Sequence, residues 1–264
     1  MKISTLKLQT QRFANILLLG ATLTIPGLVN ADTLFTISNT TADTFVSGAN
    51  PGLNYGNAGT LAIAPAGSPK GEFDSVIKFN FASTIAQFNA LYGVNQWQIT
   101  GLTLYLSSNF GTNGSIPSNT LFNTIQSGNF GIDWLSGDNW VEGSGGGNGG
   151  TGFPGNSSVS FNSISNLFLA GSSSLGTFLY NPPGNNVYTN YALPLNTGLV
   201  SDAMNGGDVS LYLFAADSQI SYLFNSRSFA SGNPELVVSV IPEPTVISLA
   251  AMMATGLFLR RKKS

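Results

Sequence analysis

Three acidic residues in one short stretch are the strongest candidates for chemistry in this 264-residue sequence: Asp133, Asp138 and Glu142. Paired carboxylates perform glycoside hydrolysis, and their separation decides whether the configuration is inverted or retained. Carboxylates on flexible loops also bind calcium, together with carbonyl oxygens. The spacing matches no calcium-binding loop, so we favour loop acids that are solvated or hydrogen-bonded. A calcium site and a catalytic pair stay open as alternatives.

The residue types that are missing narrow the chemistry further. The sequence contains no cysteine and no histidine. It therefore offers no disulfide, no thiolate nucleophile, and neither the commonest general base nor the commonest transition-metal ligand. We expect a protein that is not an enzyme and has no cofactor, with calcium as the one candidate ion.

The N-terminus has the pattern of a secretory signal peptide over residues 1–31. Three basic residues precede an apolar stretch, residues 16–29, which glycine and proline interrupt. This is the order of a charged region and a hydrophobic region in such a signal. Small residues follow, so we predict cleavage after Ala31, which makes Asp32 the first residue of the exported chain.

The charge of the exported part differs from that of the whole chain. Between Asp32 and Ile241 there are three basic and eleven acidic residues, a net charge of −8. Without a basic face the protein has no electrostatic means of holding phosphate backbones. We therefore expect no nucleic-acid partner.

Residues 32–241 are expected to form one all-β domain, a single jelly-roll-type β-sandwich. Apolar and polar residues alternate in many short segments separated by turn residues, which is the pattern of half-buried strands. The sequence predicts two short helices, Ile85–Leu91 and Thr197–Asn205. The predicted strands centre on residues 34–38, 44–46, 61–64, 75–81, 102–106, 130–134, 159–161, 177–180, 191–195, 209–213, 222–224 and 236–240.

Trp140, Glu142 and Arg227 are the candidates for glycan binding. A pyranose packs its weakly polar face on an aromatic ring, and an arginine can bind an acidic sugar through two parallel hydrogen bonds. For Trp140 a place in the core is an equal alternative. For Arg227 we favour an internal salt bridge or contacts to carbonyl groups that tie the closing strands together.

Several fragments resemble the DNRLRE domain family, which is similar to carbohydrate-binding modules. They are Ala42–Val46 with Asn54-Tyr55-Gly56, the segment Asn139–Gly143, and Phe224–Arg227 with the closing strand at Pro234–Val238. The resemblance covers about residues 42–240 and implies a β-sandwich of a secreted or surface protein. Ser228 stands where the family often has an acidic residue, and Phe161 where it often has tryptophan.

The C-terminus, residues 242–264, has three parts in a fixed order. Pro242-Glu243-Pro244 favours extended, accessible backbone. Residues 245–259 are apolar but, as a helix of roughly 22 Å, shorter than the about 30 Å of bilayer hydrocarbon. The basic residues that end the chain are Arg260, Arg261, Lys262 and Lys263.

This order resembles the PEP-CTERM sorting signal of Gram-negative bacteria. The resemblance implies an exosortase-type membrane protease as partner, a transient inner-membrane intermediate, and a final place at the cell surface or in the extracellular matrix. We expect a non-catalytic component of exopolysaccharide or biofilm with weak glycan binding. The alternatives are a carbohydrate-active hydrolase or lyase, and a purely structural surface protein.

Overall fold

The computed structural model describes residues 33–37, 40–109, 122, 127–145, 158–181, 184, 186–218 and 220–243. The chain divides into two compact units, residues 1–30 and 31–264, and the first lies outside the described residues. So do the expected cleavage point at Ala31 and Asp32, Pro244, and the tail of residues 245–264 with its four terminal basic residues. Among the helices of the described segments, none is long and apolar enough to cross a membrane.

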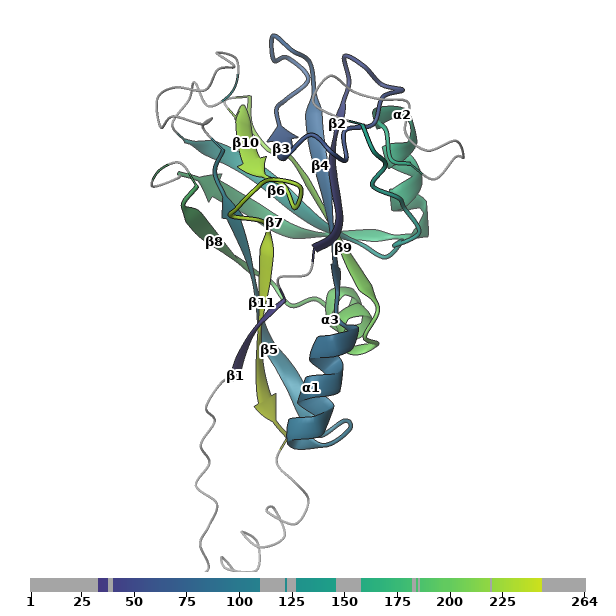
Figure 1. The fold of residues 1–264 in the computed structure, drawn as a ribbon, viewed down its shortest axis with the longest axis vertical. Coiled ribbons are helices and arrows are strands. Elements are labelled where there is room, and N and C mark those ends of the chain that lie inside the picture. Colours follow the sequence, from purple (N-terminus) through teal and green to yellow (C-terminus); the bar gives the residue numbers. More distant parts are fainter. Residues whose placement is uncertain are drawn as a thin grey trace, which may run out of the picture. The chain divides into compact units, whose positions relative to one another are not determined.

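The domain is built from antiparallel β-sheets (Figure 1). A four-stranded sheet has the order β1-β11-β5-β8, a five-stranded sheet has the order β2-β4-β9-β6-β7, and β10 pairs with β3. The strands are β1 (Thr33–Ile37), β2 (Thr40–Ser47), β3 (Thr60–Ile63), β4 (Phe73–Asn80), β5 (Trp97–Ser107), β6 (Gly128–Leu135), β7 (Ser172–Tyr180), β8 (Tyr188–Leu193), β9 (Asp208–Ala215), β10 (Tyr222–Asn225) and β11 (Glu235–Pro242).

The two large sheets share one apolar core. Alternation along the strands brings Ile77 and Phe79 of β4 into the same cluster as Leu104 of β5 and Val238 of β11, and all four are fully buried. Successive side chains of a strand point to opposite faces of the sheet, so every second residue faces the core. The sequence prediction of an all-β sandwich is thus confirmed at the level of two packed sheets.

A second cluster covers the outer face of the five-stranded sheet near its β2 edge. Val46 of β2 and Val76 of β4 pack there with Trp140, Val159 and Ile164. Ile164 belongs to the short helix α2 (Phe161–Ile164), which a 3₁₀ helix (Ser165–Ala170) follows. Because both faces are covered, β4 has no residue exposed to solvent along its length.

Most predicted elements are present, and one is wrong. Helices α1 (Ala82–Tyr92) and α3 (Thr197–Met204) lie where the sequence predicts helices. The predicted strand Val159–Phe161 does not form, because Ser160 and Ser163 form a reciprocal capping box that begins α2 at Phe161. The predicted strand 191–195 is present but differs in its end: β8 ends at Leu193, so Leu195 lies beyond the strand.

Different strands and helices lie at the two ends of the sandwich. β1, α1 and the last residues of β11 lie at the lower end in Figure 1, whereas β3 and β10 lie toward the upper end. β1 pairs with β11, and Thr33 lies opposite Val240. The described chain therefore enters and leaves the sandwich at one end.

Candidate functional site

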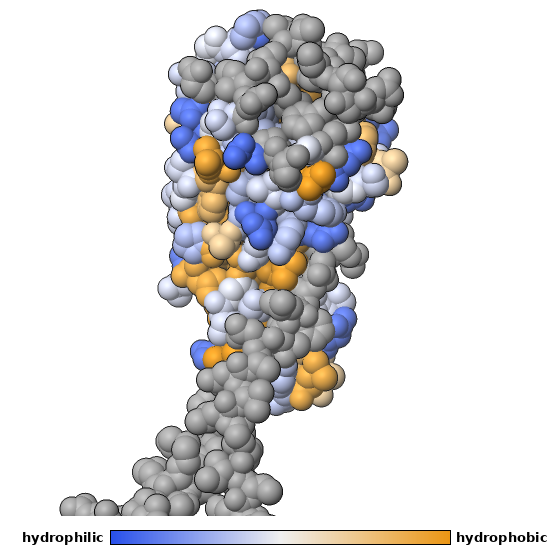
Figure 2. All heavy atoms as spheres, turned by 90° about the vertical axis from the view of Figure 1, so that its left-hand side faces the viewer, coloured by the Kyte–Doolittle hydropathy of each residue, from blue (hydrophilic) through white to orange (hydrophobic). Residues whose placement is uncertain are grey.

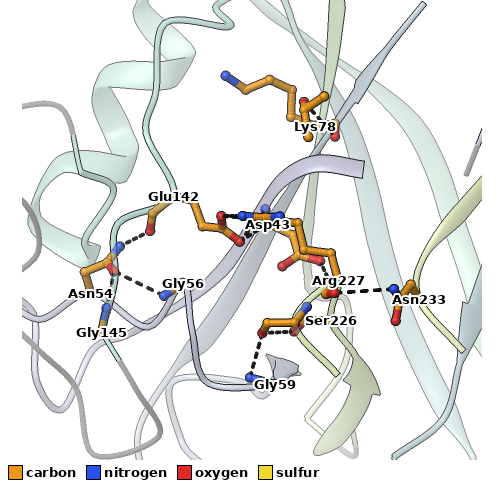
Figure 3. Close-up of polar contacts among 12 residues, drawn as sticks. Asp43, Asn54, Gly56, Gly59, Lys78, Glu142, Gly145, Ser226, Arg227 and Asn233 are labelled. Atoms are coloured by element: carbon orange, nitrogen blue, oxygen red, sulfur yellow. Dashed lines mark hydrogen bonds and ion pairs between the residues drawn. The ribbon is translucent and has the colours of Figure 1, made fainter. Parts of the chain in front are cut away.

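An ion-pair cluster joins three distant parts of the chain: Asp43 of β2, Glu142 of the segment after β6, and Arg227 of the turn after β10 (Figure 3). Arg227 Nε lies 2.8 Å from Oε1 and 2.9 Å from Oε2 of Glu142, and Nη2 also donates to Oε2. The Glu142 residue is 8% exposed, while the Arg227 side chain is 41% exposed. A buried carboxylate is thus neutralised by a cation that still reaches solvent.

Asp43 completes the ion-pair cluster through its backbone and its carboxyl group. Its backbone N–H donates to Glu142 Oε1 at 3.2 Å, and its Oδ2 accepts the backbone N–H of Arg227 at 2.7 Å. Burial, assisted by the nearby Glu142 carboxylate, raises the pKa of Asp43 to about 8 against the opposing effect of Arg227. Burial thus favours the protonated form of Asp43 at neutral pH, which leaves the Arg227 guanidinium to pair with Glu142.

Asn54 fixes the backbone around the ion-pair cluster. Its Nδ2 donates to the carbonyl oxygens of Glu142 (2.5 Å) and Val159 (2.8 Å), and its Oδ1 accepts the N–H groups of Gly56 (3.1 Å) and Gly145 (3.2 Å). Both amide hydrogens and the amide oxygen are used. The side chain of Asn54 thus connects the turn after β2 to the segment that carries Glu142.

Two glycines let these segments approach closely. A Cβ on Gly56 would lie 2.5 Å from Cγ of Glu142 and closer still to its carbonyl oxygen, and a Cβ on Gly143 would overlap the amide group of Asn54. Gly143 also has φ +79°, a conformation that favours glycine. The Asn54-Tyr55-Gly56 and Glu142-Gly143 fragments are therefore packed against each other.

A second polar cluster surrounds Lys78 on the outer face of β4. Lys78 Nζ donates to the carbonyl oxygens of Asp138 (2.6 Å) and Trp140 (2.9 Å), and lies 4.7 Å from the centroid of the Trp140 ring. Trp140 Nε1 donates to Ser210 Oγ, which donates to Asp138 Oδ1 at 2.5 Å. Burial raises the pKa of Asp138 to about 6, and the hydrogen bond from Ser210 opposes that shift.

A pocket of about 330 Å³ lies next to the ion-pair cluster, on the same face of β2. Asp43, Phe45 and Ser47 alternate along this strand and share that face. Phe45 stacks on Tyr55 with 4.2 Å between ring centroids, and Phe73 lies 5.8 Å from Phe45. The pocket is lined by Phe45, Ser47, Ala49, Asn50, Tyr55, Thr60, Ala62, Lys70, Phe73, Phe122 and Leu223.

The polar groups of the pocket are few and distinct. The Ser47 hydroxyl is buried and has no hydrogen-bond partner in the described parts of the chain. Lys70 Nζ lies 5.8 Å from the centroid of the Phe122 ring. Among the residues that line the pocket none is acidic. The pocket thus combines aromatic surfaces with a cation and an unused hydroxyl.

The predicted site residues do not form one site. Trp140 and Glu142 are buried and hold neighbouring segments together, and Arg227 forms the internal salt bridge that the sequence favoured. Asp138 accepts from Ser210, and Asp133 Oδ1 is buried without a partner among the described residues. Within those residues no group of three acidic side chains lies close enough together to hold a metal ion.

The sequence reasoning missed Asn54 as an anchor and the pocket as a whole. Alternation in the strand predicted at 44–46 could have indicated one wall of the pocket, because it places Asp43, Phe45 and Ser47 on the same face. Nothing in the spacing shows that Lys70 and Phe122 reach the same place.

Comparison with known proteins identified no relative of this chain. No protein-family model matches the chain, and no curated protein matches its sequence.

Proposed function

We propose that this protein is an exported, non-catalytic component of the cell surface or extracellular matrix that binds polysaccharide through the pocket beside Phe45. The observation that carries the proposal is the lining of that pocket by four aromatic rings, Lys70 and the Ser47 hydroxyl, which has no partner among the described residues. Sugars offer an apolar ring face to aromatic side chains and hydroxyl groups to polar ones. The volume of about 330 Å³ suits one sugar residue of a longer chain.

The proposed sandwich type is a jelly roll. The orders β1-β11-β5-β8 and β4-β9-β6-β7 are those of eight strands wound between two sheets, with β2 added at one edge. Support comes from the succession of β4, β5 and β6, which lie alternately in the five-stranded and the four-stranded sheet. In antiparallel sandwiches of this kind the loops at the ends often carry binding sites.

The absence of catalysis is supported by the state of the acidic residues. Glu142 is held in an ion pair, so its carboxylate is not available as a nucleophile or a base. Asp138 accepts a hydrogen bond from Ser210, which lies in the Lys78 cluster and not in the pocket. Neither carboxylate lines the pocket, so the pair that glycoside hydrolysis needs is not found there.

The proposed sorting rests on the tail of the chain. Export through a signal peptide, brief insertion of residues 245–259, and cutting by an exosortase-type protease near Pro242-Glu243-Pro244 would place the domain outside a Gram-negative cell. Pro242 is the last residue of β11 and pairs with Trp97, so a cut beside Pro244 leaves every strand intact. The test is whether the host has an exosortase, and its absence would contradict this route.

Binding is tested by affinity electrophoresis of the purified protein in gels that contain neutral or acidic polysaccharides. We expect retardation in at least one gel, and loss of it in Tyr55→Ala and Lys70→Ala. Leu169→Ala is the matched control, because Leu169 is 84% exposed and does not line the pocket. Retardation that survives both pocket variants would contradict the site.

The same samples separate the alternatives. Incubated polysaccharide is sized by gel filtration, and its length should not change. Shortening that Glu142→Gln abolishes would show a hydrolase or lyase and overturn the proposal. No retardation across the whole panel would favour a purely structural surface protein.

A further inference from the structure

An apolar tip lies at the end of α1, formed by Leu91 and Val94. These two residues are 61% and 67% exposed. α1 ends at Tyr92, the N–H of the next residue, Gly93 (φ +94°), donates to Asn89 O at 2.9 Å, and Asn95 also has a positive φ, +58°. Two left-handed residues around Val94 form a tight turn, and the side chain of Val94 projects from it into solvent.

This apolar tip lies directly beside the last described residues of the chain. The backbone N–H of Glu243 donates to Gln96 O at 2.7 Å, and Gln96 N–H donates to Gly93 O at 3.2 Å. One hydrogen bond thus connects the strand end to the turn that carries Val94. Figure 2 shows a small hydrophobic area at the lower end of the domain, the end at which α1 lies in Figure 1.

The apolar tail begins only two residues after Glu243. Two extended residues span at most about 7 Å. If residues 245–259 insert in a bilayer, the membrane surface must therefore come within that distance of Glu243 and of the turn beside it. In the inserted chain the apolar tip would therefore lie close to the lipid.

The length of the tail strengthens this constraint. A helix of roughly 22 Å is shorter than the about 30 Å of hydrocarbon, and a short span is accommodated by thinning of the bilayer or by movement of its flanks toward the interface. On the cytoplasmic side, long lysine and arginine side chains can snorkel. On the other side only Pro244 separates Glu243 from residues 245–259, so insertion of these residues would draw the folded domain against the lipid.

The composition of α1 and the turn after it suits a lipid interface. No charged residue occurs between Lys78 and Asp133, a stretch that includes α1, the turn and β5. Burying a charge in the interface would be costly, whereas leucine and valine gain free energy there. Tyr92, between the two apolar residues, is of the type enriched at membrane interfaces.

We propose that Leu91 and Val94 form a membrane-contacting tip, which enters the lipid interface while the tail spans the bilayer and leaves it when the tail is cut. This rests on the proposed membrane-inserted intermediate. The tip contacts the bilayer surface and orients the domain on it.

The absence of cysteine from the sequence makes the test direct. The full chain is reconstituted in vesicles of phosphatidylethanolamine and phosphatidylglycerol with an environment-sensitive fluorophore on one introduced cysteine. The variants are Leu91→Cys, Val94→Cys, the tail control Ala251→Cys, and Leu169→Cys as an exposed apolar control outside the tip. Circular dichroism of each variant checks that the fold is retained.

We expect lipids with a shallow nitroxide to quench at least half of the fluorescence at positions 91 and 94, and to leave position 169 nearly unquenched. Quenching at position 251 without quenching at 91 and 94 would overturn the inference while leaving the inserted intermediate in place. No quenching at position 251 by lipids with a nitroxide deep in the acyl chain would contradict the intermediate itself, and the inference with it.

Discussion

Glu142 and Arg227 are 85 residues apart in sequence, and their side chains form a salt bridge in which both carboxylate oxygens accept hydrogen bonds from the guanidinium group. The bridge connects the segment after β6 to the turn after β10. Asn54 holds the backbone of the same glutamate, and the neighbouring Tyr55 stacks on Phe45 in the pocket. The ion-pair cluster therefore determines the position of one pocket wall.

Arg227→Ala should destabilise the fold, because it leaves the buried Glu142 carboxylate without its cation. We expect a loss of about 1–3 kcal/mol in the free energy of unfolding, less than for a fully buried pair because Arg227 is partly solvated. Urea denaturation measures it. In the double variant with Glu142→Gln the loss should be smaller than the sum of the two single losses. Additive losses would mean that the two side chains do not interact in solution.

Asp43→Asn should flatten the dependence of stability on pH. The pKa of Asp43 is about 8 when folded and 3.8 in a model compound, so the folded state holds this proton more tightly. Its contribution to stability is complete below about pH 4 and is lost as the pH rises through about 8. Melting temperatures at pH 5 and pH 8.5 should differ less in the variant than in the wild type.

The stability of the Asp43→Asn variant should still fall slightly as the pH rises. Burial also raises the pKa of Asp74 to about 7, although Tyr212 opposes that shift with a hydrogen bond of 2.7 Å. Parallel curves for the wild type and Asp43→Asn would show that Asp43 is ionised when folded.

Gly56→Ala should destabilise the protein, whereas Gly52→Ala should not. The added methyl group at position 56 meets the backbone and side chain of Glu142, but at position 52 nothing lies within 4 Å. Forcing a group into filled space costs about 1–3 kcal/mol, and a surface change usually stays within about 0.5 kcal/mol. Equal thermal midpoints for the two variants would rule out the close approach of the two segments.

The two lysines of the described β-domain should respond differently to substitution. Lys78→Met leaves two carbonyl oxygens without a donor and should lower the free energy of unfolding by about 2 kcal/mol. Lys70→Met should leave stability within about 0.5 kcal/mol and weaken only polysaccharide binding. Chemical denaturation and affinity electrophoresis of both variants separate these effects. A stable Lys78→Met protein would contradict the structural role of that lysine.

Excess calcium should leave the melting temperature unchanged, and a chelator should do the same. A ligand that binds only the folded state raises its stability in proportion to the logarithm of the ligand concentration. Asp138 and Glu142 already have hydrogen-bonding partners of their own, so they are not free to ligate an ion together. A calcium-dependent rise in differential scanning calorimetry would restore the metal alternative.

Alternation predicted the strands well, because buried apolar residues recur at every second position in β9, in β11 and in Leu102–Leu106 of β5, and Ile77 and Phe79 do the same in β4. It did not predict α2, since Val159-Ser160-Phe161 alternates like a strand and only the Ser160–Ser163 contact decides its form. The sequence favours an internal salt bridge or carbonyl contacts for Arg227, because it is the only arginine between Asp32 and Ile241. The identity of its partner depends on a long-range approach, which glycines at 56 and 143 permit and no local pattern reveals.

The pairing of β1 with the end of β11 has a consequence for multivalency. Both chain ends leave the sandwich at one side, while β3 and β10, whose residues help to line the pocket, lie toward the other. Many copies tethered by their tails would form a two-dimensional array with pockets directed outward, and one long polymer could engage several of them. Linked sites raise the effective concentration of each successive contact. Cutting the tail would remove that gain, so a released copy of the proposed polysaccharide-binding domain would hold a polymer through its single pocket.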